Sequence, residues 1–154
     1  MTIMPVTPQM IQLAQQFIDK IPFNRLLGIQ LDEISSEQVV MHLPMRDELV
    51  GNHLQGILHG GAISTILDVA GGGMALMSVF QKLPAEPAVE ELMKLARIGT
   101  IDLRVDYLRP GRGQLFTARA TLLRSGNKVA VVRSELHNES GDLIATGTGT
   151  YLVG

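Results

Sequence analysis

The sequence predicts an α+β fold in which one antiparallel sheet surrounds a single long, buried helix. Two observations support this prediction. Residues 61–80 form an apolar run, and between Gly60 and Gln81 the only formal charge is Asp68. From Gly99 onward, apolar residues recur at every second position, and three turn signals divide that part of the chain into four strands. A helix so poor in charge lies in a core, and the strands supply the surface that covers it.

Four elements are predicted before the buried helix. They are a helix over residues 8–18, a compact connector over 22–28, a hairpin of strands 29–34 and 39–43, and an irregular, glycine-rich segment over 50–61. The first helix start is the clearest signal, because Thr7 can cap the helix and Pro8 suits its first position. Pro22 is expected to end that helix. On the buried helix, one face gathers Ile63, Ile66, Leu67, Ala70, Met74 and Met77.

Five elements are predicted after the buried helix. They are an amphipathic helix over residues 88–98 and four strands over 101–107, 115–124, 128–136 and 143–152. Glutamates at the start of the helix, with Lys94 and Arg97 near its end, suit the helix dipole. Apolar and charged residues alternate without interruption from Ile101 to Tyr107, which makes this the clearest strand in the sequence.

The composition excludes several classes of function. The 154 residues fit one domain, over residues 1–154, and a formal net charge of -2 argues against nucleic-acid binding. With no cysteine and no HExxH spacing among the four histidines, neither a metal nor a cofactor is predicted. No apolar run is expected to span a membrane, and residues 1–8 lack the features of a signal peptide. We therefore expect a cytoplasmic protein that acts on a small molecule.

His59, Gly60 and Gly61 stand where a loop enters the buried helix. The first N–H groups of a helix have no acceptor within the helix, and the partial positive charge there suits an anion or a developing oxyanion. Glycine at this place lets a ligand approach the backbone closely. Taken alone, the triplet has a plain structural reading, in which His59 only caps the helix by a hydrogen bond.

Asp68 lies about two turns further along the same helix. A buried carboxylate is unfavourable unless it is paired or used, so its presence requires an explanation. Residues 71–73 are all glycine, and each destabilises a helix by roughly 1 kcal/mol relative to alanine. Ser64 and the first two of these glycines share the side of Asp68, so something bulky, either a neighbouring backbone or a ligand, is expected there. A helix end that can stabilise an oxyanion, followed by a buried carboxylate, indicates a reaction at an acyl group.

The spacing from His59 to Asp68 resembles the HGG…D signature of the PaaI-type hotdog-fold acyl-CoA thioesterases. The chain is more similar to one branch of that family, the YigI-type thioesterases, over almost all of residues 22–154. The stretches that carry this closer resemblance are Pro22–Arg25, Gly99–Gly113, Asn127–Val131 and Thr148–Gly154. The resemblance implies a hotdog fold, in which a curved antiparallel sheet wraps round the buried helix and subunits pair edge to edge into a homodimer or homotetramer.

The resemblance also implies a site between subunits that hydrolyses medium- to long-chain acyl-CoA to fatty acid and CoA. A backbone N–H at Gly60 or Gly61, next to His59, would polarise the thioester carbonyl. Asp68 of the other subunit would act either as a nucleophile or as a general base on water, and the residues alone do not decide between these roles.

The sequence departs from the family pattern at one position. The family often has Asn or Gln six residues before the histidine of the triplet, where this chain has His53. Asn52 takes that place if a bulge shifts the register; otherwise His53 itself or Gln55 is the polar residue that supports the site. Thr100 resembles the Ser or Thr that the family places at the start of the clearest strand, although an ordinary strand-start hydroxyl fits equally. Ser64, on the side of Asp68, is a further candidate for substrate binding.

The phosphates of CoA require cations. Arg109 and Arg112 lie at one predicted turn and Arg124 and Lys128 at the next, and all four are candidates for phosphate binding. Charged residues at hairpin turns also simply keep a surface soluble. The helix over 88–98 either closes an acyl tunnel or packs on the sheet. Candidate liners of that tunnel are Met74, Met77 and Met93.

Two other functions are consistent with these features. A hotdog dehydratase or hydratase acts on acyl thioesters with a histidine and an acidic partner, and no second His–acid pair stands out in the sequence. A non-catalytic acyl-CoA-binding protein that senses its ligand would normally carry a helix-turn-helix, which 154 residues near neutral charge do not predict. Release of free thiol from acyl-CoA separates hydrolysis from both.

Overall fold

The computed structural model describes residues 5–154. The helical elements are α1 (Pro8–Asp19), α2 (Pro22–Leu27), the 3-10 turn η1 (Asp47–Leu49), α3 (Gly60–Phe80), α4 (Val89–Leu92) and the 3-10 turn η2 (Met93–Arg97). The strands are β1 (Gln30–Ile34), β2 (Val39–Pro44), β3 (Val50–Asn52), β4 (Ile57–Leu58), β5 (Gly99–Tyr107), β6 (Leu115–Ser125), β7 (Val129–Asn138) and β8 (Leu143–Leu152).

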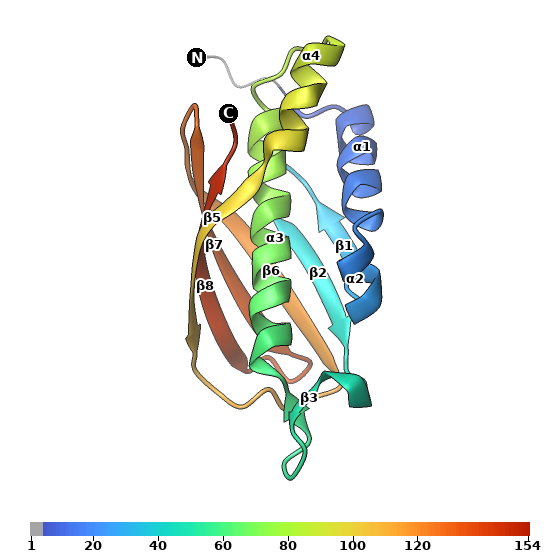
Figure 1. Cartoon of the computed structure of the whole chain (residues 1–154), viewed down its shortest axis with the longest axis vertical. Helices are drawn as coiled ribbons and strands as arrows, with labels where there is room; N and C mark the ends of the chain where they lie inside the picture. Colours follow the sequence, from blue (N-terminus) through green and yellow to red (C-terminus); the bar gives the residue numbers. More distant parts are fainter. Residues whose placement is uncertain (1–4) are drawn as a thin grey trace.

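Six of the strands form one antiparallel sheet in the order β1-β2-β6-β7-β8-β5. The sheet curves behind α3, and α1 and α2 lie beside α3 on the β1–β2 side (Figure 1). The short hairpin of β3 and β4 projects below the N-terminal end of α3 (Figure 1). This arrangement confirms the predicted α+β class and the hotdog fold that the resemblance implied.

The core lies between α3 and the sheet. The predicted apolar face of α3 is buried as expected, and the strands opposite it carry small residues that let the helix approach. Gly147 on β8 is one of these, because a Cβ there would lie 2.8 Å from Ser134 Oγ and 3.5 Å from Leu67 Cβ. The small inward residues on the other strands are Ala118, Ala120 and Ala130.

The length of α3 corrects one expectation. Its 21 residues reach a mean hydropathy of 1.6 in the most apolar window, so by length and composition the helix could cross a membrane. Within the fold, however, 72% of that window is buried. The sheet covers the apolar surface of α3, so α3 is the core helix of this domain.

Two further segments differ from their predictions. Residues 22–27 form helix α2 rather than a connector, because Pro22 occupies a first-turn position where its fixed φ and missing N–H are tolerated. Gly28, with φ of 80°, ends this helix in the left-handed conformation. Residues 88–98 form only the short α4 and the turn η2, neither of which has a buried residue. Leu92 and Leu95 pack against the core only as partly buried residues, so this segment has less of the tertiary packing that stabilises short helices.

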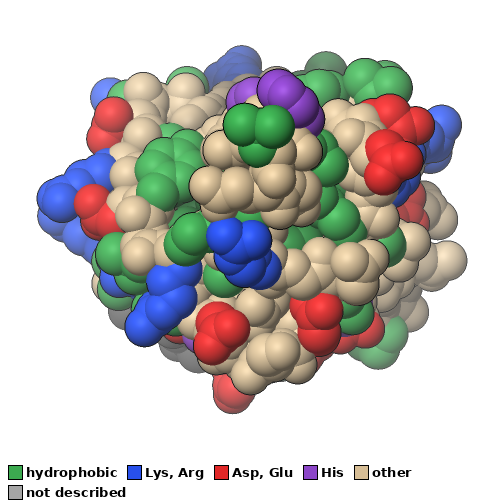
Figure 2. Space-filling model, turned by 90° about the horizontal axis from the view of Figure 1, so that it is seen from below, with side chains coloured by type: hydrophobic (Ala, Val, Ile, Leu, Met, Phe, Trp, Pro, Cys, Tyr) green, Lys and Arg blue, Asp and Glu red, His purple; other side chains and the backbone are tan. Residues whose placement is uncertain are grey.

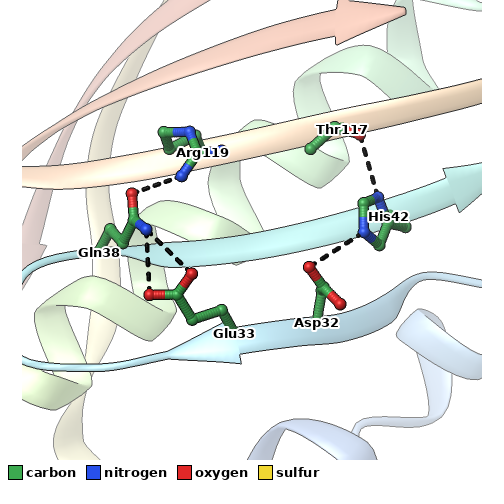
Figure 3. A network of polar contacts seen from close by, with 6 residues as sticks. All are labelled: Asp32, Glu33, Gln38, His42, Thr117 and Arg119. Atoms are coloured by element: carbon green, nitrogen blue, oxygen red, sulfur yellow. Dashed lines mark hydrogen bonds and ion pairs between the residues drawn. The ribbon is translucent and has the colours of Figure 1, made fainter. Parts of the chain in front are cut away.

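Polar contacts on the outer surface of the sheet connect the β1–β2 hairpin to β6 (Figure 3). His42 Nε2 lies 3.2 Å from Asp32 Oδ2, and its Nδ1 lies 3.0 Å from Thr117 Oγ1. Gln38 joins the same two neighbouring strands, because its Nε2 donates to the Glu33 carboxylate and its Oε1 accepts a hydrogen bond from Arg119. His42 lies between the buried Met41 and Leu43 on β2, so its contacts with the neighbouring strands help to fix the register that places these apolar residues inside.

Strand β5 forms one edge of the six-stranded sheet. Its register with β8 shifts between Thr100 and Asp102, so Ile101 leaves the predicted alternation and is exposed. Tyr107 and Leu108 at the other end of the strand are also exposed. A nine-residue edge with unpaired backbone groups and apolar side chains is a surface to which another strand can pair.

Candidate functional site

A groove of about 430 Å³ runs along the open face of α3. Its floor is a stripe of helix positions four residues apart, which places Ser64, Asp68, Gly72 and Leu76 on one line. Helices α1 and α2 form one wall, and α2 is held against α1 by the buried Asn24, whose Nδ2 donates to the carbonyl of Ile18. The other wall is formed by Ile98, Gly99, Thr100, Leu103 and Tyr151.

Asp68 is half-buried and lines this groove, which corrects the expectation of a buried carboxylate. Thr100 Oγ1 donates to Asp68 Oδ1 at 2.9 Å. The single Tyr151 O–H is shared between the same Oδ1, at 3.2 Å, and the main-chain carbonyl oxygen of Asp68, at 3.1 Å. Both hydroxyls contact Oδ1, and no hydrogen bond within residues 5–154 occupies Oδ2. One carboxylate oxygen is therefore held by two hydroxyls, and the other has no hydrogen-bond partner among the described residues of this groove-lining side chain.

Tyr151 is the functional neighbour that sequence reasoning missed. Its ring lies between two glycines, because a Cβ at Gly71 would overlap Tyr151 Oη and one at Gly149 would lie 2.8 Å from Tyr151 Cζ. The bulky group beside Gly71 is thus a side chain, and not the neighbouring backbone or ligand that the sequence led us to expect. Burial raises the pKa of the Tyr151 phenol well above its usual range, and the negative charge of Asp68 raises it further. The phenol consequently stays a hydrogen-bond donor wherever the carboxylate is ionised.

The raised pKa of Tyr151 predicts a loss of stability in alkali. In the unfolded chain the phenol releases its proton near pH 10, whereas the folded protein keeps it, so the folded state loses up to about 1.4 kcal/mol per pH unit above that value. Tyr151→Phe lacks this ionisation, so the Tm of the wild type should fall relative to the Tm of Tyr151→Phe as the pH rises from about 9 to 11. A difference that stays constant over this range would contradict the prediction.

The N-terminal end of α3 carries the His-Gly-Gly triplet. His59 caps the helix, and its Nδ1 accepts the Gly61 N–H at 2.7 Å. The Gly60 N–H, the first of the helix, meets no acceptor among residues 5–154. The Gly60 carbonyl accepts a hydrogen bond from Tyr107 Oη at 3.1 Å, which fixes the orientation of this segment. Of the two glycine N–H groups that the sequence suggested, the one at Gly60 is free to bind a ligand.

One chain alone does not bring the two halves of the site together. Gly60 and Asp68 are eight residues apart on a continuous helix, so about 12 Å of helix axis separates them. A single thioester group cannot contact both across that distance. Ser64 lies between them and lines the groove, but its Oγ donates to the carbonyl of Gly61 at 3.0 Å.

The polar candidates in the hairpin lie at the end of α3 that carries the triplet. Asn52 Oδ1 accepts the Leu54 N–H at 3.1 Å and thereby stabilises the β3–β4 turn. Gln55 Oε1 accepts from Arg112 at 2.7 Å, and Arg109 donates to the carbonyl of Leu143 at 2.9 Å. Figure 2 shows this end of the molecule, where Arg and Lys side chains lie next to apolar surface.

Arg124 and Lys128 lie at the opposite end of β6, where they flank a second hollow. Lys128 also lines a neighbouring hollow together with Lys82, Lys94 and Arg97. The length of β6 places this end roughly 35 Å from the turn that carries Arg109 and Arg112. The four predicted cations thus form two separate pairs within one chain.

The methionines expected to line an acyl tunnel do not line the groove. Met74 and Met77 are fully buried between α3 and the sheet, and Met93 is 61% exposed on η2. The reason is their position on the helix, because Met74 and Met77 lie on the sheet-facing side of α3 and Asp68 on the open side. The apolar lining comes instead from Phe17, Ile18, Ile21, Phe23, Val69 and Leu76.

Comparison with known proteins places this chain in one family. The thioesterase superfamily model matches residues 55–145. The medium/long-chain acyl-CoA thioesterase YigI of Escherichia coli K12 is 48% identical over 142 residues, which are 92% of this chain and 92% of that protein. A crystal structure of a Shewanella oneidensis protein related to the thioesterase superfamily has a TM-score of 0.89 at 44% identity, covering 95% of this chain and 96% of that one.

A more distant structure shares the fold alone. The PaaI protein of E. coli, from the phenylacetic acid degradation operon, is 20% identical and has a TM-score of 0.75, covering 96% of this chain and 95% of that one. The family model covers more than half of the chain, and the relatives align along nearly all of it. The chain therefore belongs to the thioesterase superfamily.

Proposed function

We propose that the protein hydrolyses medium- to long-chain acyl-CoA to free fatty acid and CoA, in the cytoplasm, as a homodimer or homotetramer with its sites between subunits. The observation that carries this proposal is the position of Asp68, a carboxylate with one oxygen held by two hydroxyls and the other open to a largely apolar groove. The similarity to a medium/long-chain acyl-CoA thioesterase at 48% identity supports the choice of substrate.

The geometry at Asp68 suits attack on a thioester. Thr100 and Tyr151 hold Oδ1, so Oδ2 either attacks the carbonyl carbon itself or takes a proton from a water that attacks it. In both routes negative charge develops on the carbonyl oxygen, and a helix N–H such as that of Gly60 stabilises it. The C–S bond then breaks, and the CoA thiolate leaves and takes up a proton. If water attacked, the acyl group leaves as the fatty acid in this step; if Asp68 attacked, the acyl group stays on Asp68 as an anhydride, which water then hydrolyses to the fatty acid and the free carboxylate.

The second half of the site comes from another subunit in this proposal. About 12 Å of helix separates Gly60 from Asp68 within one chain, and β5 offers an open edge on the Asp68 side of the groove. Two copies paired edge to edge about a twofold axis run antiparallel, so the helix end of one copy can approach the carboxylate of the other. His59 and Asn52 then act through the backbone, as the cap and the turn that orient the Gly60 segment.

The same antiparallel pairing brings opposite ends of two subunits together. One CoA molecule can therefore contact both cation pairs only if each pair comes from a different subunit. We assign the CoA phosphates to Arg109 and Arg112 of one copy and to the Arg124–Lys128 pair contributed by the other. Replacing both Arg124 and Lys128 by glutamine should raise KM for acyl-CoA by roughly tenfold and leave KM for the matching acyl-pantetheine, which lacks these phosphates, unchanged. An equal rise for both substrates would contradict this assignment.

A thiol-release assay tests the activity directly. The purified protein is incubated with straight-chain acyl-CoA substrates of increasing length, and free CoA is followed with a thiol reagent. Turnover with medium and long chains supports the proposal. Conversion of 3-hydroxyacyl-CoA to enoyl-CoA without thiol release would instead identify a dehydratase. Binding of acyl-CoA without any turnover would identify a binding protein.

A further inference from the structure

Packing accounts for two of the three consecutive glycines in α3. A Cβ at Gly71 would overlap Tyr151 Oη, and a Cβ at Gly73 would lie 3.3 Å from Val39 Cγ1. A Cβ at Gly72 would instead meet only Tyr151 Cε1, at an ordinary 3.8 Å, and the φ of Gly72 is not positive. Neither the neighbours nor the backbone conformation requires glycine at position 72.

Gly72 lies on the floor of the groove, one helical turn beyond Asp68. It is half-buried, and about 6 Å of helix axis separates it from Asp68. Leu76 follows one turn further and is almost fully buried, so the open stripe of α3 ends there. The floor of the groove is therefore polar at Ser64 and Asp68 and apolar from Gly72 to Leu76.

We propose that Gly72 determines the acyl-chain length that the enzyme accepts, because its missing side chain keeps the groove open directly beyond the thioester. Leu76 forms the end of the same passage. This inference rests on the proposed thioesterase function and adds to it the residues that select the substrate. Glycine makes a helix interior less stable than alanine does, and at position 72 it leaves space on the floor of a groove whose lining is mostly apolar.

The test compares chain-length profiles of kcat/KM from butanoyl-CoA to hexadecanoyl-CoA. Gly72→Leu should move the optimum to shorter chains, with a loss of roughly 100-fold for hexadecanoyl-CoA and a change of at most about twofold for butanoyl-CoA. Leu76→Ala should move the optimum to longer chains. Gly72→Ala should raise Tm by about 2–4 °C, because alanine favours the helix and its Cβ meets Tyr151 Cε1 only at an ordinary contact distance of 3.8 Å.

Two control variants separate this inference from general effects on the fold. Gly71→Ala should lower Tm, because it must displace Tyr151, and Met93→Ala on the exposed turn η2 should leave the profile unchanged. A folded Gly72→Leu variant with the wild-type profile, or with an equal loss for every chain length, would overturn the inference.

A binding measurement distinguishes failure of this inference from failure of the proposed function. The Tm of the wild type and of Gly72→Leu is measured with hexadecanoyl-CoA and with CoA alone. If hexadecanoyl-CoA raises the Tm of the wild type but not that of Gly72→Leu, the role of Gly72 is supported even when neither protein hydrolyses the substrate. Equal stabilisation of the two proteins would refute it, and wild-type turnover would then still uphold the proposed function.

Discussion

Replacing Asp68 by asparagine is expected to lower kcat for acyl-CoA hydrolysis by roughly 10³-fold. Asparagine has the same shape, and its Oδ1 can still accept the hydrogen bonds from Thr100 and Tyr151, so the fold should not change. What is lost is the charge on the oxygen that faces the groove, which both possible routes of attack require. Thiol release under saturating substrate measures the effect.

The matched control for this prediction is Asp102→Asn. Asp102 is an exposed carboxylate on the same strand as Thr100, and it does not line the groove. This variant should keep wild-type activity, and both variants should keep the wild-type Tm within a few degrees. Full turnover by a folded Asp68→Asn protein would remove Asp68 from the mechanism.

Replacing Gly60 by proline is expected to lower kcat by roughly 10²–10³-fold, because it deletes the free N–H that we assign to the thioester oxygen. Proline is tolerated at the first position of a helix, and His59 before it already has the extended conformation that proline favours. Gly60→Ala is the control, since it keeps the N–H and its Cβ lies 3.4 Å from Tyr107 Cε1. Equal activity of the two variants would exclude the Gly60 N–H as the donor.

Mixed oligomers of these two inactive proteins test whether the site is shared between chains. A dimer of one Gly60→Pro chain and one Asp68→Asn chain holds one intact site if Gly60 and Asp68 come from different subunits. About half of the wild-type activity per dimer is then expected. If each site lay within one chain, the mixed dimer would be inactive.

Much of this fold could be predicted because its signals are local. The apolar run of α3, with its single charge, and the alternation from Leu103 to Tyr107 are local patterns. Each residue in them is apolar or polar because of its own contact with the core or with solvent. Asp68 was found for the same reason, as a lone charge in an apolar helix. Pro22 shows where local signals fail, because a proline that cannot continue one helix is equally suited to begin the next.

The rest of the site depends on contacts that the sequence separates widely. Tyr151 reads as an ordinary core residue of a strand, and its partner Asp68 is 83 residues away. The available signal was the set of glycines around it, in α3 and two residues before it in β8, which leave room for a large ring. Methionine is an adaptable lining residue, but Met74 and Met77 lie on the sheet-facing side of α3, whereas the stripe through Asp68 leads to Gly72 and Leu76.

The contact between Tyr151 and Asp68 also has a consequence for the time at which activity arises during folding. Tyr151 lies on β8, which pairs with β7 and β5 in the interior of the sheet, so it reaches Asp68 only after these long-range pairings have formed. Pairings of such high contact order form slowly compared with local helices. An intermediate with a helical α3 and an incomplete sheet would hold a carboxylate without its two hydroxyl partners. Recovery of hydrolysis during refolding would therefore report completion of the sheet, later than any spectroscopic signal from the helices.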